Sequence, residues 1–244
     1  MKNPQTIREM FSSIAPRYDL ANQVLSFGIH KLWRKELVNW IANSHRNTEH
    51  SSNKPLRILD CATGTGDLAI EIKKNFKNRA HVTATDFCDD MLVTAPAKAQ
   101  KKGCDIVFQS ADTMNLPFAD ETFDVVTIAF GIRNVADPEK ALAEMTRVLK
   151  PKGEIYILEF GQPKSPWFHK MYTVYSQKIL PKIGSVVTGS KEAYQYLESS
   201  SAEFPCDSKF IELMQKSAPL TCLHARPLSM GIAYIYRATK AIFI

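Results

Sequence analysis

Two glycines and two acids gather in one short stretch, "LDCATGTGDLA", at residues 59–69. Gly64 and Gly66 form with Ala69 a loose G-x-G-x-x-A pattern, which is typical of a strand-to-helix turn that binds a dinucleotide. Asp86 ends the next apolar run, where a carboxylate can bind two ribose hydroxyls. The spacing therefore predicts a site for an adenosine-containing cofactor and fits NAD as well as other adenosyl ligands.

The acids Asp60 and Asp67, which bracket this turn, distinguish between the two kinds of ligand. A helix N-terminus ordinarily attracts phosphate, but two adjacent carboxylates repel a pyrophosphate. S-adenosylmethionine has no phosphate and carries two cations, which carboxylates attract. We therefore expect the turn to bind S-adenosylmethionine, with a packed turn without ligand as the alternative. Asp112, in the loop after a later apolar run, is placed to accept a hydrogen bond from adenine, unless it is only a surface acid.

The elements that must position these residues alternate between strand-like and helix-like segments. The clearest helix spans 137–150, with Asp137 as N-cap and Pro138 at its first position. Short β-branched runs bounded by polar residues predict buried strands at 56–60, 81–86, 105–109, 123–129 and 154–160. This alternation predicts an α/β fold, a doubly wound Rossmann-like parallel sheet that binds ligands at the carboxyl ends of its strands.

Outside this core the pattern changes at both ends of the chain. Residues 5–17 have a helical pattern, 42–55 form a polar linker, 165–217 are mostly helical and 231–238 return to a strand pattern. We predict a helical N-terminal lid or substrate segment at 1–50 and a cofactor-binding domain at 51–244, with a helical insert at about 161–217. Together they form a single domain.

Composition places the chain among ordinary globular proteins: 244 residues, 45% hydrophobic and 23% charged. No apolar run is long enough for a membrane span and the first residues lack a signal-peptide pattern, so we expect a cytoplasmic protein. The five scattered cysteines have no metal-ligand spacing, and no metal is expected.

At this point the chain resembles the UbiE/MenG/COQ5 family, class I methyltransferases that methylate a ring carbon of a prenylated quinol in menaquinone and ubiquinone synthesis. The resemblance rests on "YDLANQVLSFGIHKLWR" (18–34), "FGIRNVADPEKAL" (130–142) and "RVLKPKGEIYILEF" (147–160). It implies a mostly parallel sheet with an antiparallel C-terminal strand, and cofactor contacts from Thr65, Asp86 and the pair Asp112–Thr113. The chain departs from the pattern at Ala21, Ala62, Ala129 and Lys152.

Methylation of a quinol carbon requires a phenolate, whose charge makes the adjacent ring carbon nucleophilic. Arg133 and Asn134 follow the fourth predicted strand, and Arg133 either stabilises the phenolate or forms a structural salt bridge. His30 is the candidate general base, with helix packing as the alternative. Tyr18 and Asp19 either order the lid or take part in the chemistry directly.

The insert predicts contact with a membrane surface, where a prenyl-tailed quinol would enter. Between Glu159 and Glu192 lie no acid and five lysines, which are Lys164, Lys170, Lys178, Lys182 and Lys191. Aromatic residues are interleaved among them, and this composition is typical of a membrane interface. A solvated lid is the alternative. An RNA or other small-molecule methyltransferase remains the alternative function, but the central part of the chain is net acidic and "FGIRN" replaces the N-P-P-Y of DNA amino-methylating enzymes, so no nucleic acid is expected.

Overall fold

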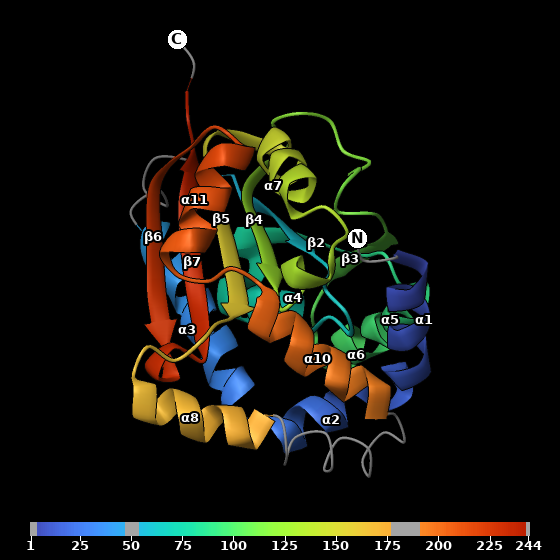
Figure 1. The fold of residues 1–244 in the computed structure, drawn as a ribbon. Helices are drawn as coiled ribbons and strands as arrows, with labels where there is room; N and C mark the ends of the chain where they lie inside the picture. Colours follow the sequence, from blue (N-terminus) through green and yellow to red (C-terminus); the bar gives the residue numbers. More distant parts are fainter. Residues whose placement is uncertain (1–3, 47–53, 177–190, 243–244) are drawn as a thin grey trace.

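The computed structural model describes residues 4–46, 54–176 and 191–242, which form one seven-stranded sheet with helices on both faces (Figure 1). The strand order is β3-β2-β1-β4-β5-β7-β6, and β7 runs in the direction opposite to the other strands of this sheet. The prediction of a mostly parallel sheet with an antiparallel C-terminal strand is confirmed. The strands are β1 Leu56–Cys61, β2 Ala80–Asp86, β3 Ile106–Ser110, β4 Phe123–Ala129, β5 Leu149–Phe160, β6 Leu220–Leu228 and β7 Ala233–Lys240.

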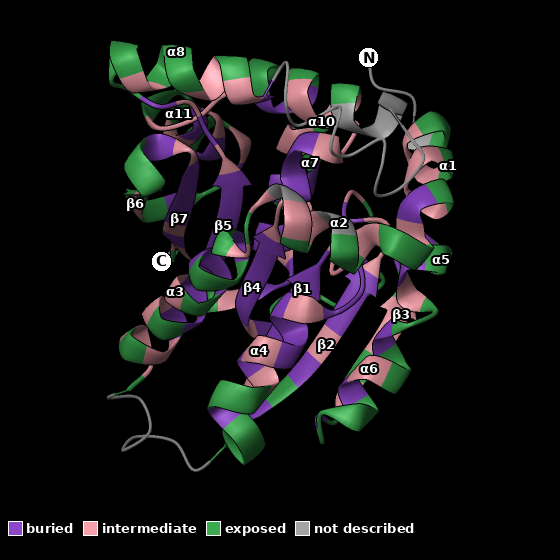
Figure 2. Cartoon of the chain, turned by 90° about the horizontal axis from the view of Figure 1, so that it is seen from below, coloured by how far each residue is buried: buried purple, intermediate pink, exposed green. Residues whose placement is uncertain are grey.

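The central strands of the sheet are largely buried (purple in Figure 2). Their successive residues pack in clusters on opposite faces of the sheet. Val125 of β4 packs in the cluster formed by helices α3 (Ile29–Ser44) and α4 (Asp67–Phe76). Its neighbour Val126 packs in the cluster of α7 (Pro138–Arg147) and α11 (Ser208–Ser217). Burial on both faces explains why these strands are continuous apolar runs in the sequence.

The helix predicted at 137–150 is α7, which ends earlier than expected. Asp137 is the N-cap, and its side chain accepts a hydrogen bond of 3.0 Å from the Lys140 backbone N–H. The end differs because Leu149 already pairs with Phe123 as the first residue of β5. Strand β6 is absent from the sequence prediction because it lies at the sheet edge and is mostly exposed, so its apolar residues do not alternate.

In the structure, only some of the helices in the predicted lid (1–50) and insert (161–217) lie at the ligand edge of the sheet. Helices α1 (Pro4–Ile14) and α2 (Tyr18–Leu25) lie beyond the carboxyl ends of the parallel strands, as do α8 (Pro166–Val174) and α10 (Lys191–Glu203) (Figure 1). In contrast, α3 and α11 pack on the sheet through fully buried side chains, such as Leu37 and Phe210. Only part of 1–50 and of 161–217 therefore covers the ligand edge. Two short helices, α5 (Asp89–Leu92) and α6 (Ala95–Lys101), follow β2.

Glu154 of β5 joins the end of α3 to the sheet. Its Oε1 accepts hydrogen bonds from Ser44 Oγ at 3.1 Å and Arg237 Nε at 3.0 Å, and its Oε2 lies 3.1 Å from His45 Nε2 and 2.7 Å from the hydroxyl of Tyr156. Burial alone would raise the pKa of Glu154, but the bonds from His45, Arg237 and Tyr156 outweigh it and lower the pKa to about 2.

A lowered carboxyl pKa stabilises the fold above the unfolded value of 4.5 and loses this contribution as pH falls toward about 2. We expect Glu154→Gln to remove that part of the decline in the free energy of unfolding, measured by urea denaturation from about pH 5 to about pH 3. The exposed Glu212→Gln is the control and should keep the wild-type slope. An unchanged slope in Glu154→Gln would contradict this account.

Candidate active site

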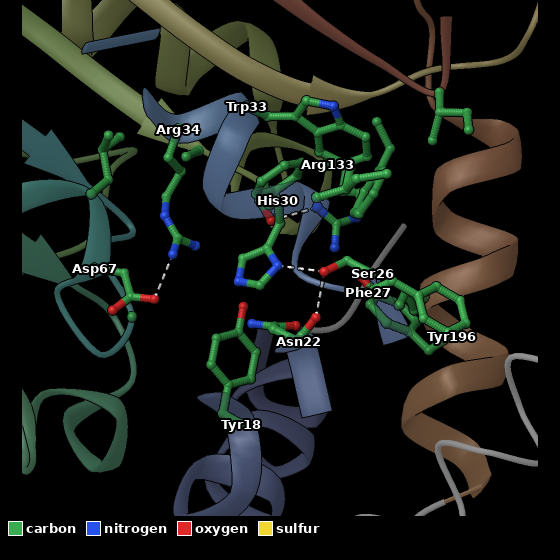
Figure 3. A pocket seen from close by; sticks show the side chains of 18 of the residues that line it. Tyr18, Asn22, Ser26, Phe27, His30, Trp33, Arg34, Asp67, Arg133 and Tyr196 are labelled. Atoms are coloured by element: carbon green, nitrogen blue, oxygen red, sulfur yellow. Dashed lines mark hydrogen bonds and ion pairs between the residues drawn. The ribbon is translucent and has the colours of Figure 1, made fainter. Parts of the chain in front are cut away.

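A single cavity of about 950 Å³ extends from the glycine turn to the helices beyond the sheet edge (Figure 3). Its walls come from α1, α2, α3, α8 and α10, and from the ends of β1, β4 and β5. Apolar and aromatic side chains dominate the lining, with few charged groups among them. The volume is that of a site for an organic ligand.

The glycine turn between β1 and α4 forms the inner end of the cavity. Gly66 has φ of 81°, and a Cβ added there would lie 3.0 Å from the ring of Phe108, so only glycine fits. The carboxylate of Asp60 accepts hydrogen bonds from Thr63 Oγ1 at 2.6 Å and from Thr127 Oγ1 at 2.7 Å. Burial raises the pKa of Asp60 to about 6 despite these bonds. Ala62, one of the positions at which the chain departs from the family pattern, has φ of 48°.

Asp86 ends β2, and its carboxylate is hydrogen-bonded to the backbone of the glycine turn. Its Oδ2 accepts a hydrogen bond from the Gly64 N–H at 2.7 Å, and its Oδ1 accepts one from the Cys88 N–H at 2.9 Å. Asp112 and Thr113 follow β3 at the same sheet edge, and Asp112 Oδ1 accepts from the Met114 N–H at 2.8 Å. None of the three predicted cofactor contacts Asp86, Asp112 and Thr113 lines the cavity.

A cluster of ion pairs ties the lid to the turn. The Thr65 hydroxyl donates to Asp19 Oδ1 at 2.6 Å, and Lys98 Nζ lies 2.5 Å from both Asp19 Oδ2 and Asp67 Oδ1. Arg34 Nη2 lies 2.8 Å from Asp67 Oδ2. Two cations therefore balance Asp67, which corrects the expectation that Asp60 and Asp67 act together against a pyrophosphate. Asp60 is the acid of the turn that no ion pair compensates among the described residues.

His30 of α3 is buried and lines the cavity. Its Nδ1 is hydrogen-bonded with Ser26 Oγ (Figure 3). Desolvation, together with the positive charge of Arg34, lowers the pKa of His30 to about 4, so the imidazole is neutral at physiological pH. Tyr18 of α2 lines the same cavity, and burial raises the pKa of its hydroxyl. The structure thus brings a neutral imidazole and a protonated phenol together.

Arg133 lies in the short helix η4 (Ile132–Asn134), directly after β4. Its Nη1 lies 2.7 Å from Glu159 Oε1, and both side chains are buried. Its guanidinium carbon also lies 5.0 Å from the ring centroid of Phe160. The salt bridge that the sequence left open therefore exists, although Arg133 still lines the cavity. Glu159 is a partner that the sequence analysis did not identify.

Asn134 lies outside the cavity lining and connects two elements. Its Nδ2 donates to the Phe130 carbonyl at 3.3 Å, and its Oδ1 accepts from the Tyr196 hydroxyl of α10 at 3.2 Å. This places Asn134 between the turn after β4 and a lid helix.

Three aromatic rings that the sequence analysis did not single out line the cavity beside Arg133. The ring centroids of Phe130 and Phe160 are 4.6 Å apart, and that of Trp33 is 6.1 Å from Phe130. The sequence contained a signal for the two phenylalanines: Phe130 directly follows β4 and Phe160 ends the neighbouring parallel strand β5, so the two must meet at the ligand edge.

The predicted site residues thus separate into two groups. Six of them line the cavity: Tyr18, His30, Asp60, Gly64, Thr65 and Arg133. The other six lie beside it or hold its walls: Asp19, Gly66, Asp86, Asp112, Thr113 and Asn134.

The sheet order and the glycine turn at the end of β1 define the class I methyltransferase fold. Solved structures agree: the CurJ carbon methyltransferase superimposes with a TM-score of 0.70 and 16% identity, over 96% of this chain and 61% of that one. A methyltransferase from Thermotoga maritima gives a TM-score of 0.63 and 19% identity, over 96% of this chain and 99% of that one.

Within this class, the model of the ubiE/COQ5 methyltransferase family matches residues 1–240, and the chain belongs to that family. A relative from Bdellovibrio bacteriovorus, named ubiquinone/menaquinone biosynthesis C-methyltransferase UbiE, is 53% identical over 97% of both chains. A demethylmenaquinone methyltransferase from Deinococcus radiodurans is 41% identical over 97% of this chain and 93% of its own length. The resemblance seen in the sequence is confirmed.

The positive charge of Arg34 lowers the pKa of His30, and this effect can be tested by substitution. We expect Arg34→Met to raise the pKa of His30 from about 4 toward 6.5, because the cation is removed while Asp67 stays. Proton NMR of the imidazole C–H signals against pH measures this value. Lys35→Met, which removes an exposed cation from the next position of α3, is the control and should leave the pKa in place. An unchanged pKa in Arg34→Met would rule out the electrostatic cause.

Proposed function

We propose that the chain is an S-adenosylmethionine-dependent C-methyltransferase that methylates the ring of a prenylated quinol. Its proposed reaction converts demethylmenaquinol to menaquinol, with the ubiquinone precursor as a further substrate. The observation that carries this proposal is a continuous, largely apolar cavity that joins the glycine turn to His30 and Arg133. The names of the relatives, at 53% and 41% identity, support it. A largely apolar lining does not favour RNA as substrate.

The donor set at the turn fits S-adenosylmethionine. Asp60 and the backbone at Gly64 face the cavity, and Arg34, the cation on this wall, already pairs with Asp67. A carboxylate has about four lone-pair positions, so Asp86, which accepts two backbone bonds, keeps capacity for ribose hydroxyls. We propose that these residues hold the cofactor, with Thr65, Gly66 and the pair Asp112–Thr113. When bound, it supplies an electrophilic methyl group.

The chain's own residues would prepare the quinol. His30, which is neutral, accepts the hydroxyl proton of the substrate on its ring, and the phenolate that remains makes the adjacent carbon nucleophilic. Arg133 stabilises the developing negative charge on the substrate oxygen. Its ion pair with Glu159 partly cancels the positive potential of the guanidinium at that oxygen. The apolar walls exclude water, which favours a reaction between groups of opposite charge. Tyr18 and Asp19 order the lid that closes over this site.

The proposal is tested with purified protein, S-adenosylmethionine and demethylmenaquinol, with the product analysed by mass spectrometry. A mass gain of one CH₂ on the ring would support it. Calorimetry separates the cofactors: saturable binding of NAD, with none of S-adenosylmethionine, would exclude it. A chain that binds S-adenosylmethionine but does not methylate the quinol would contradict the substrate while preserving the class of enzyme.

The pKa of His30 predicts the pH dependence of turnover. Because only the neutral imidazole accepts a proton, kcat/KM should fall as pH drops through about 4. His30→Gln should lose this acidic limb and slow turnover by about 10²–10⁴-fold, the usual effect of a missing general base. Steady-state kinetics across pH measure both effects, with calorimetry showing unchanged cofactor affinity. Wild-type turnover and pH profile in His30→Gln would make His30 a packing residue.

We further propose peripheral contact with the inner face of the membrane at the mouth of the cavity. Phe27 and Trp167 both line the cavity and are 75% exposed, so they belong to its rim. Lys170 also lines the cavity and is exposed. Of the other lysines, Lys164 pairs with Asp207, whereas Lys178, Lys182 and the Lys191 side chain lie outside the described residues. No helix in the described ranges has the length and apolarity to cross a bilayer.

Exposed aromatic and basic side chains at this rim should bind anionic vesicles, and binding should weaken with salt. Trp167→Ala should reduce co-sedimentation with anionic liposomes, because it removes apolar area that enters the interface. Val107→Ala, an equally simple truncation of an exposed residue on the edge strand β3, is the control. Equal binding to neutral vesicles, or no binding at low salt, would indicate a merely solvated lid.

A further inference from the structure

Ser26, which follows α2 at the bend before α3, contacts two groups at once. Its Oγ lies 2.6 Å from the backbone carbonyl oxygen of Asn22, and it is also hydrogen-bonded with Nδ1 of His30 (Figure 3). A serine hydroxyl carries one hydrogen, so only one of these two bonds can be donated by Ser26.

The carbonyl of Asn22 decides which bond this is. A carbonyl oxygen has no hydrogen, so two oxygens 2.6 Å apart require the hydroxyl hydrogen of Ser26 between them. Ser26 Oγ is then the acceptor in its bond with His30, and the hydrogen of that bond belongs to Nδ1. The bond made by one ring nitrogen fixes the protonation of the other. In the neutral ring, Nε2 therefore carries the lone pair.

We infer that Ser26 is a positioning residue that holds His30 as the Nδ1–H tautomer, with Nε2 left to accept the proton of the substrate hydroxyl. This inference rests on the proposed function for the identity of that substrate. Within the described parts of the chain Nε2 makes no hydrogen bond, and His30 lines the cavity. The base and the serine that orients it thus form a unit with the carbonyl of Asn22.

The same unit stabilises the imidazolium that proton transfer produces. Nδ1–H continues to donate to Ser26, which passes the polarisation on to the Asn22 carbonyl near the negative C-terminal end of α2. Among the charged groups that act on His30, Asp67 and Asp19 also favour the cation, whereas Arg34 and Lys31 oppose it. In the transfer the O–H bond of the quinol breaks, an N–H bond forms at Nε2, and the electron pair stays on the oxygen.

The tautomer is measured directly by two-bond proton–nitrogen NMR on protein labelled with ¹⁵N-histidine, with His30→Gln to assign the signals. Wild type should show a protonated Nδ1 and an unprotonated Nε2 for His30. Ser26→Ala should shift the ring toward the other tautomer, and Ser26→Thr, which keeps a hydroxyl, should restore the wild-type pattern. Ser217→Ala, which removes a similar bond of 2.6 Å to the Leu213 carbonyl at the end of α11, should change nothing.

Turnover is the second readout. Ser26→Ala should lower kcat by about 10–100-fold, the effect of losing a hydrogen bond to a charged group, with an unchanged KM for the quinol. It should have no further effect in the His30→Gln background. A wild-type ring protonated at Nε2, or a Ser26→Ala variant with an unchanged tautomer, would overturn the inference. The tautomer is read without quinol, so failure of the substrate assay would contradict the proposed function alone.

Discussion

The buried carboxylate of Asp60 is the constraint on which the site depends. It stands at the end of β1, and its two oxygens accept hydrogen bonds from Thr63 in the glycine turn and from Thr127 in β4. The strand order reverses between β1 and β4, and in such sheets the ligand crevice opens at this point. The Asp60 side chain therefore fixes the glycine turn relative to β4. The cavity begins at the carboxyl ends of β1 and β4.

The charges around the cavity are mostly compensated by the chain itself. Asp67 is balanced by Arg34 and Lys98, and Arg133 is balanced by Glu159. Because breaking a buried pair leaves an uncompensated charge, these pairs hold the lid, the turn and the strand ends in one arrangement. What remains toward the ligand is an apolar wall, the carboxylate of Asp60 and the neutral imidazole of His30, with Lys170 exposed at the rim. Such a site suits a reaction in which a phenolate and a cationic methyl donor neutralise each other.

The sequence predicts the fold and the location of the site because both follow from local patterns. Buried strands are continuous apolar runs, and the carboxyl ends of parallel strands must meet, which brings Gly64, Asp86 and Arg133 to one edge. The edge strand β6 lacks such a pattern because most of its residues are exposed. The ion pairs were not predictable, because nothing in the spacing of Arg133 and Glu159 selects them over other partners. The contact of Thr65 with Asp19 also depends on how α2 closes over the turn.

The most direct test of this account is a crystal structure of the protein with S-adenosylhomocysteine and a prenylated quinol. We expect both ligands in the one cavity, with the nucleoside at the glycine turn beside Asp86 and the quinol ring between His30 and Arg133. The prenyl tail should leave past Phe27 and Trp167 at the rim. A quinol ring bound outside this cavity, or a nucleoside bound away from the turn, would contradict the claim that the cavity brings cofactor and substrate together.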